Sequence, residues 1–211
     1  MAANPGFPIS LDVRGWPVLV IGGDDEAADK TLRLLEAGAK VTAISSVLNE
    51  TLRKLAASAK IIHRGRTFRA TDLESVILVL NMIRGDREFS QSLMSLAREQ
   101  KFLLWSVDQP DSSNVIMPAV VSCGHLRVAV STSGQAPALS GFIKEDLEKV
   151  FGEEFAAFID WLGQLRERAK ADEPDVEKRR ALLREALDGF RLYGKVQYPK
   201  VWVDERAKQQ A

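Results

Sequence analysis

Short apolar runs alternate with amphipathic segments in the first half of the chain. The stretch PVLVIGG at 17–23 is continuously apolar and ends in glycine, a pattern typical of a strand buried on both faces of a parallel sheet. Residues 24–39 carry leucines and alanines spaced among charged residues, which predicts an amphipathic helix that stops at Gly38. The stretch KVTAIS at 40–45 predicts a second strand.

The same alternation continues to residue 108. We expect further helices at 47–57 and 86–100, and further strands at 59–66, 74–83 and 102–108. This strand–helix rhythm predicts an α/β fold, a Rossmann-like doubly wound parallel sheet. Ligands of such sheets bind beyond the carboxyl ends of the strands, so the segments that follow the strands are expected to share one edge.

The pattern changes after residue 113. Residues 114–134 predict two β segments around a Cys-Gly-His turn, and 136–152 predict a helix. Residues 153–190 are charged and helical, and we expect two helices that separate near 171–177. No clear period continues into the tail.

Composition narrows the class of protein. The 29 basic and 29 acidic residues balance, which argues against a general nucleic-acid or membrane-surface binder. No window approaches 18 uninterrupted apolar residues, and the N-terminus has no signal-like core. The single cysteine, Cys123, fits a reducing compartment, so we expect a cytoplasmic protein. A Cys/His metal cluster is not expected, because the only other candidates are His63 and His125.

The turn after the first strand departs from the dinucleotide pattern G-x-G-x-x-G/A. Its three small-residue positions hold Gly22, Asp24 and Ala27, so the residue that lets the backbone approach the pyrophosphate is replaced. A carboxylate about 4 Å from a phosphate charge costs about 4 kcal/mol before screening, at an effective dielectric near 20. Asp25 and Glu26 add to this field. Alternatively, the Asp24 side chain rotates away and caps the helix.

Four stretches carry a resemblance to a known family. They are FPISLDVRGWPVLVIGG (7–23), KTLRLLEAGAKVTAIS (30–45), VDQPDSSNVIMPAVV (107–121) and LRVAVSTSGQAPALSGFIKEDLE (126–148). The chain resembles the precorrin-2 dehydrogenase/sirohydrochlorin ferrochelatase family, which comprises the N-terminal module of siroheme synthases and its stand-alone relatives. The last two stretches are the most specific, because family members have an Asp-x-Pro turn and A-I-S-T-G-G-x-S-P-x-L-A there.

The resemblance implies an oxidoreductase that removes two hydrogens from the tetrapyrrole precorrin-2 with NAD, giving sirohydrochlorin. It also implies a homodimer and, in some members, insertion of ferrous iron as a second reaction. The family's aspartate, implicated in both steps, falls on Asp108, a carboxylate suited to accepting protons. The expected domains are an NAD(P)-binding domain at 1–112, a dimerisation region at 113–152 and a helical C-terminal domain with its tail at 153–211.

The candidate site residues follow from the turn, the strand ends and the resemblance. The cofactor-binding candidates are Gly22, Gly23, Asp25, Glu26, Ser46 and Val47, and no acidic residue ends the second strand to bind a ribose. The substrate-binding candidates are Ser131, Thr132, Ser133 and Arg84. The three hydroxyls are alternatively ordinary N-caps. Arg84 would neutralise Asp24 or Asp25, bind a substrate carboxylate, or lie exposed in a loop.

Three departures from the family cluster at the presumed cofactor edge. The turn reads GGDD instead of three glycines, NMIRGD (81–86) replaces A-A-T-D-D, and Trp105 stands where members have asparagine. These departures leave three alternatives open: a dehydrogenase with unusual cofactor contacts, a chelatase-only enzyme with a degenerate NAD site, or a non-catalytic tetrapyrrole-binding protein.

Overall fold

The protein is described by a computed structural model over residues 6–203 and 206. Residues 204–205 and 207–211 of the predicted tail lie outside the described part. The chain divides into two compact units, and each is described by itself. The first contains residues up to 121 together with 127–149, and the second contains 122–126 together with the residues from 150 onward.

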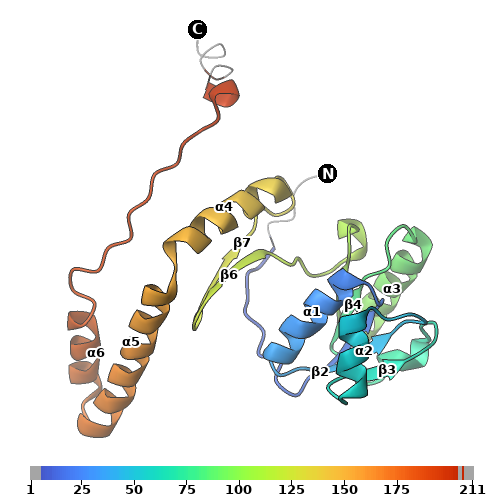
Figure 1. The fold of residues 1–211 in the computed structure, drawn as a ribbon, viewed down its shortest axis with the longest axis horizontal. Coiled ribbons are helices and arrows are strands. Elements are labelled where there is room, and N and C mark those ends of the chain that lie inside the picture. The colour runs from blue at the N-terminus through green and yellow to red at the C-terminus, as the bar shows by residue number, and fades with distance from the viewer. Residues whose placement is uncertain (1–5, 204–205, 207–211) are drawn as a thin grey trace. The chain divides into compact units, whose positions relative to one another are not determined.

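The first unit is built around a five-stranded parallel sheet (Figure 1). The strands lie in the order β3-β2-β1-β4-β5. The chain forms β1, β2 and β3 toward one edge of the sheet, and then crosses to the other side of β1 to form β4 and β5. Their bounds are β1 Pro17–Ile21, β2 Lys40–Ile44, β3 Ile62–Arg64, β4 Leu78–Asn81 and β5 Leu103–Ser106. The intervening helices are α1 Asp25–Glu36, α2 Glu50–Ala57 and α3 Arg87–Gln100, and two short 3₁₀ helices span Ala70–Leu73 and Pro110–Ser112. The predicted fold class is confirmed.

Alternation along β1 distributes its side chains between two cores. Val18 and Val20 face the core that also takes side chains from α1 and α2, whereas Leu19 and Ile21 face the core that takes side chains from α3. All four are almost fully buried, because a parallel sheet covered by helices on both faces buries both sides of its strands. The strand ends therefore form a rigid edge for a site.

Several predicted boundaries differ from the structure. The strand expected at 59–66 is limited to β3, because Ala59 adopts a positive φ of 54° and turns the chain before it. The helix expected at 47–57 begins only at Glu50, because the Asn49 side chain accepts the N–H of Leu52 (2.8 Å) and caps the helix there. The strand expected at 74–83 is limited to β4. A 3₁₀ helix precedes it, and Ser75 adopts a positive φ of 62°, which is incompatible with a continuous strand.

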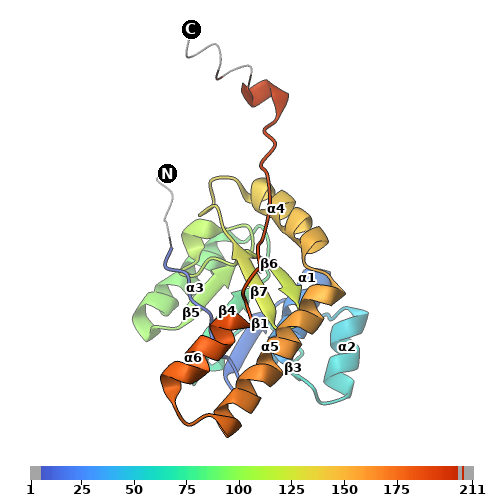
Figure 2. The same cartoon turned by 90° about the vertical axis from the view of Figure 1, so that its left-hand side faces the viewer.

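The remaining elements follow the predicted order. Strands β6 (Ala119–Cys123) and β7 (Leu126–Val130) form a two-stranded sheet around the Cys-Gly-His turn, and α4 spans Pro137–Val150. In the second unit, α5 (Glu153–Asp172) and α6 (Val176–Glu185) lie side by side, as Figure 1 and Figure 2 both show.

Aromatic side chains of the second unit gather in one cluster. Phe155 and Phe158 of α5 both contact the ring of Phe190, and the Phe158 and Phe190 rings stack with centroids 5.6 Å apart. Cys123 is buried in this unit and its Sγ donates to the carbonyl of Gly152 (3.1 Å), as expected for a small packed side chain.

Candidate functional site

The turn after β1 owes its glycines to close packing against neighbouring strand ends. Gly22 has a φ of +139° and its N–H donates to the carbonyl of Ile44 (2.9 Å). A Cβ at Gly22 would lie 2.7 Å from the Cβ of Met82, and a Cβ at Gly23 would lie 2.0 Å from the carbonyl oxygen of Val47. Both positions therefore require glycine to keep this turn against the ends of β2 and β4.

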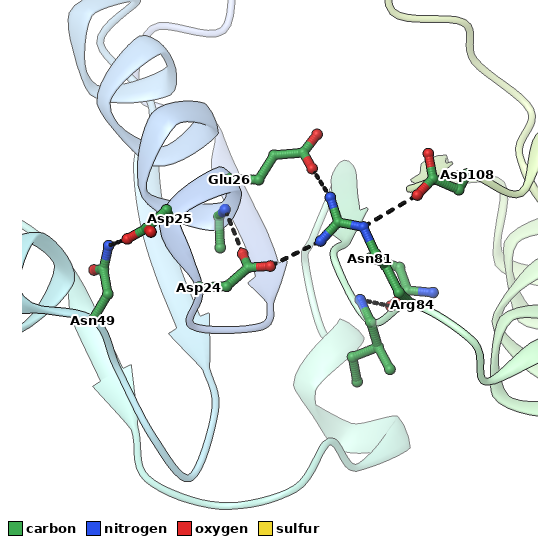
Figure 3. Close-up of polar contacts among 9 residues, drawn as sticks. Asp24, Asp25, Glu26, Asn49, Asn81, Arg84 and Asp108 are labelled. Atoms are coloured by element: carbon green, nitrogen blue, oxygen red, sulfur yellow. Dashed lines mark hydrogen bonds and ion pairs between the residues drawn. The ribbon is translucent and has the colours of Figure 1, made fainter.

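Asp24 turns its carboxylate aside, which is the alternative that the sequence left open. Its Oδ1 accepts the N–H of Ala27 (2.8 Å) and caps α1, and its Oδ2 accepts from Nη1 of Arg84 (3.0 Å). Asp25 is engaged elsewhere, because its Oδ1 accepts from the side-chain amide of Asn49 (2.9 Å). Arg84 thus neutralises Asp24 and not Asp25 (Figure 3).

Arg84 is the centre of a cluster of four charged side chains, which we call the Arg84 cluster: Asp24, Glu26, Arg84 and Asp108. Its Nη2 pairs with Glu26 and its Nε donates to Oδ2 of Asp108 (3.1 Å), as Figure 3 shows. The hydrogen bond to Asp108, together with the nearby negative charges, raises the pKa of the Arg84 guanidinium. One cation therefore joins the turn after β1 to the aspartate after β5.

Asp108 lies just beyond the end of β5 and faces outward. Its φ of +54° is left-handed, a conformation that aspartate tolerates better than most residues. The side chain is 74% exposed. Its Oδ1 has no hydrogen-bond partner within the described part of the chain. Asp108 is therefore held by one oxygen and open at the other.

Asn81 supports this geometry and was not singled out from the sequence. It ends β4, is fully buried, and its Nδ2 donates to Oγ of Ser90 (2.8 Å). Its Oδ1 accepts the N–H of Ile83 (3.1 Å), which fixes the segment that leads to Arg84 (Figure 3). An amide at the end of an otherwise apolar strand is the signal that would have found it, since buried polar groups need partners.

Ser46 and Val47 line a second part of the same edge. They border an open cavity of about 380 Å³ at the carboxyl ends of β2 and β3, together with Leu48, Arg53, Ala56 and His63. Nε2 of His63 lies 2.9 Å from the carbonyl oxygen of Ser45, so the ring is held in place at the cavity wall. The cavity adjoins the turn, because Val47 contacts Gly23.

The hydroxyls before α4 are engaged locally. Oγ1 of Thr132 accepts the N–H of Ala136 (3.1 Å) and the hydroxyl of Ser140 (3.3 Å). Oγ of Ser131 accepts the N–H of Ser133 (3.1 Å). Thr132 therefore holds the loop just before α4 and bonds the amide of Ala136, the residue that precedes the helix.

The basic residues after β3 do not form a free cationic edge. Arg64 and Arg66 both pair with the carboxylate of Asp72, whose side chain is fully buried. The hydrogen bond from Arg66 is the main cause that holds the pKa of Asp72 well below its usual range. An internal carboxylate therefore already holds both Arg64 and Arg66.

Two features of the described residues bear on the class of site. No three or more His, Cys, Asp or Glu side chains of residues 6–203 and 206 come together as a set of metal ligands. None of the helices in that part of the chain is long and apolar enough to cross a bilayer.

The donors along the sheet edge fit a dinucleotide. The amides of Asp25 and Glu26 begin α1, where N–H groups lack intrahelical acceptors and favour an anion. Arg84 supplies a cation beside them, and the cavity at Ser46 and Val47 is open at the end of β2. One oxygen of Asp24 is used in the cap of α1, and Arg84 offsets part of the negative charge that Asp24 shares with Glu26 and Asp108.

Comparison with known proteins places this geometry in a family. A family model described as putative NAD(P)-binding matches residues 9–119. The siroheme synthase of Neisseria meningitidis serogroup C (strain 053442) is 32% identical over 183 residues, which cover 87% of this chain and 38% of that protein. Siroheme synthase 3 of Aeromonas hydrophila is 32% identical over 186 residues, which cover 88% of this chain and 40% of that protein.

The chain spans about two fifths of the length of these curated relatives. A solved structure named SirC, precorrin-2 dehydrogenase, has the same fold, with a TM-score of 0.76 and 23% identity over 97% of this chain and 98% of that one. The family inferred from the sequence is confirmed. The chain belongs to the putative NAD(P)-binding family and, within it, to the relatives of the siroheme synthases.

Proposed function

We propose that the protein catalyses the NAD(P)-dependent dehydrogenation of precorrin-2 to sirohydrochlorin, a step of siroheme biosynthesis. The observation that carries the proposal is the position of Asp108, which Arg84 joins to the glycine turn of a dinucleotide-binding sheet. The relatedness to siroheme synthases over 87% of the chain supplies the substrate class. NAD is the dinucleotide that the family resemblance implies, and a cytoplasmic location belongs to the same proposal.

Asp108 is the proposed base. Removing two hydrogens from a carbon skeleton amounts to losing a hydride and a proton. A dinucleotide held at the glycine turn would supply the hydride acceptor. The Oδ1 atom of Asp108 is open to the substrate and accepts the proton, while the bond from Arg84 to Oδ2 (3.1 Å) holds the carboxylate in orientation. Arg84 acts as a positioning residue in this step.

The decisive experiment is an anaerobic assay of precorrin-2 oxidation with the purified protein. We expect turnover by the wild type and a loss of at least about a hundredfold in kcat for Asp108→Asn, since positioned acid–base groups contribute about 10²–10⁴-fold. Asp111→Asn is the matched control, because Asp111 is an exposed aspartate three residues away in the Pro110–Ser112 3₁₀ helix. Full activity of Asp108→Asn would refute the role of Asp108.

Insertion of ferrous iron into sirohydrochlorin is the second candidate function. The same open oxygen of Asp108 would accept the pyrrole protons that metal insertion releases. Insertion of cobalt or iron without oxidation of precorrin-2 would identify a chelatase-only enzyme. Binding of sirohydrochlorin with neither reaction would identify a non-catalytic tetrapyrrole-binding protein. The substrate contacts proposed for Ser131, Thr132 and Ser133 are tested by the KM of alanine variants in whichever assay is positive.

A homodimer through residues 113–152 also belongs to the proposal. In α4, Leu139, Phe142 and Ile143 are 50%, 67% and 37% exposed, and their spacing places them on one face of the helix. Exposed apolar stripes of this kind mark interfaces. We therefore propose that this face of α4 is covered by a second copy of the chain. The proposed domains on either side of this region are the dinucleotide-binding domain at 1–112 and the helical domain at 153–211.

A further inference from the structure

The groove between α5 and α6 is rich in cations. It is an open cavity of about 260 Å³ within the second unit, where the two helices lie side by side (Figure 2). Its charged lining residues are Arg166, Lys170, Arg179 and Arg180, and its apolar lining residues are Ala169, Val176 and Leu183. None of these seven residues is acidic. Each helix therefore contributes one face, with residues three and four positions apart.

Like charges meet across this groove. In paired helices, flanking residues of opposite charge commonly bond across the seam. Here Arg166 and Lys170 are four residues apart on α5, a spacing at which like charges repel. Arg179 and Arg180 add two more positive charges from α6. The arrangement is unfavourable by itself, and an anion between the helices would relieve it.

The neighbouring carboxylates offset only part of this charge. Glu167 pairs with Lys170 (2.6 Å) and Glu177 pairs with Arg180 (2.6 Å), each within its own helix. Asp175 is used in the cap of α6, where its Oδ1 accepts two backbone N–H groups. The four lining cations and their two paired carboxylates therefore leave a net charge of +2 at the groove.

Two of the arginines have donors to spare. Arg166 forms no hydrogen bond or ion pair with the other residues of 6–203 and 206. Arg179 uses its Nη1, which donates to the carbonyls of Glu173 (2.7 Å) and Pro174 (2.9 Å). These bonds hold the Arg179 guanidinium beside the groove and leave its other nitrogens without a partner in the described part of the chain. A guanidinium fork matches the two oxygens of a carboxylate.

The size and charge of the groove define the class of ligand. Pockets that enclose a drug-sized molecule measure about 300–1,000 Å³, so this smaller cavity takes a small anion or one edge of a larger one. Precorrin-2, the proposed substrate, carries an acetate and a propionate on each of its pyrrole-derived rings. One such ring edge is an apolar body with two negative charges, which complements a net charge of +2 beside apolar side chains.

We propose that the groove between α5 and α6 binds one ring edge of a carboxylated tetrapyrrole. Arg166 and Arg179 bind the carboxylates, and Val176 and Leu183 contact the ring edge. The inference rests on the proposed function for the identity of the ligand, because that function supplies the tetrapyrrole. It adds to the protein a tetrapyrrole contact in the helical unit, besides the one proposed at Asp108.

Calorimetric titration of the whole protein with uroporphyrin, without dinucleotide, tests this site apart from turnover. Uroporphyrin carries an acetate and a propionate on every ring, whereas coproporphyrin has a methyl group in place of each acetate. The wild type should bind uroporphyrin at least about tenfold more tightly at this site, since a hydrogen bond to a charged group is commonly worth a decade in affinity.

Variants assign that binding to the groove. Arg166→Gln combined with Arg179→Gln should lose one class of uroporphyrin sites, and any tetrapyrrole held at Asp108 should remain. Lysine at both positions keeps the charges and should keep part of the affinity, which separates loss of charge from loss of fold. Arg168→Gln is the matched control, because Arg168 is an exposed arginine of α5 that does not line the groove.

The outcomes separate this inference from the proposed function. Equal uroporphyrin binding in the wild type and the double glutamine variant would overturn the site and leave a dehydrogenase intact. Inorganic phosphate that binds as tightly through the same two arginines would also overturn it, because the groove would then hold anions in general. Loss of uroporphyrin binding confined to the double glutamine variant would establish the site, even if precorrin-2 is not oxidised.

Discussion

Opposite charge changes in the Arg84 cluster should move dinucleotide affinity in opposite directions. The cluster holds three carboxylates and one guanidinium, so its net charge is −2 at neutral pH. Asp24→Asn raises the net charge to −1, and Arg84→Gln lowers it to −3. Asparagine caps a helix as well as aspartate does, so Asp24→Asn keeps the bond to Ala27 (2.8 Å) and changes only the charge.

The size of the change in dinucleotide affinity follows from how exposed the charged side chains are. The side chains of Arg84 and Asp24 are 48% and 47% exposed, so each change of one charge is worth about two- to fivefold, as for exposed ion pairs. We expect Asp24→Asn to bind the dinucleotide about two- to fivefold more tightly. Arg84→Gln should bind about tenfold more weakly, because it loses a phosphate-binding cation as well as a counter-charge.

Calorimetric titration at low and at high salt is the assay. Both effects should shrink at high ionic strength, because exposed charges are screened. Asp24→Asn should raise the dinucleotide affinity more in an Arg84→Gln background, because no guanidinium then offsets the carboxylate of Asp24. Arg87→Gln, an exposed arginine at the start of α3, is the control for loss of a nearby positive charge. Equal affinity in the wild type, Asp24→Asn and Arg84→Gln would refute the electrostatic reasoning about this turn.

Three further predictions concern stability and assembly. Gly23→Ala should lower the free energy of unfolding by about 1–3 kcal/mol, since its Cβ would meet the carbonyl of Val47 at 2.0 Å, whereas Gly65→Ala has room and should be neutral in the same denaturant titration. Asp72→Asn should cost about 3 kcal/mol at neutral pH. Because the folded-state pKa of Asp72 is depressed, this contribution is present above pH about 4 and is lost as the pH falls through the folded-state pKa, so the two unfolding curves should converge in acid. Phe142→Glu should give a monomer by light scattering if α4 forms the proposed dimer interface, and an unchanged dimer would count against it.

The sequence predicted the sheet well because burial leaves a simple pattern. A strand such as β1, covered on both faces, must be apolar throughout, and the helix after it must alternate apolar and charged residues. The ends of elements were harder to predict. The start of α2 depends on a single side-chain cap from Asn49, and apolar periodicity does not record such a bond.

The site was only partly predictable, because its contacts join residues far apart in the chain. Asp24 and Arg84 were both named from the sequence, but the pairing of Arg84 with Glu26 and Asp108 depends on β1, β4 and β5 lying side by side. The pairing of Arg64 and Arg66 with Asp72 was missed for a similar reason. A buried carboxylate in a 3₁₀ turn is not distinguishable from an exposed one by sequence pattern alone.

Two of the departures from the family's pattern therefore form one structural feature. A glycine turn needs no counter-charge, whereas a turn that carries Asp24 and Glu26 beside a diphosphate site needs a cation within reach. The segment NMIRGD supplies that cation at position 84, at the end of the strand adjacent to β1. The acid that would oppose a phosphate is thereby turned to the cap of α1, and the cation that holds it also orients Asp108. The altered turn and the altered segment after β4 are thus paired by charge, and we propose that together they keep a dinucleotide site, although either alone would argue against one.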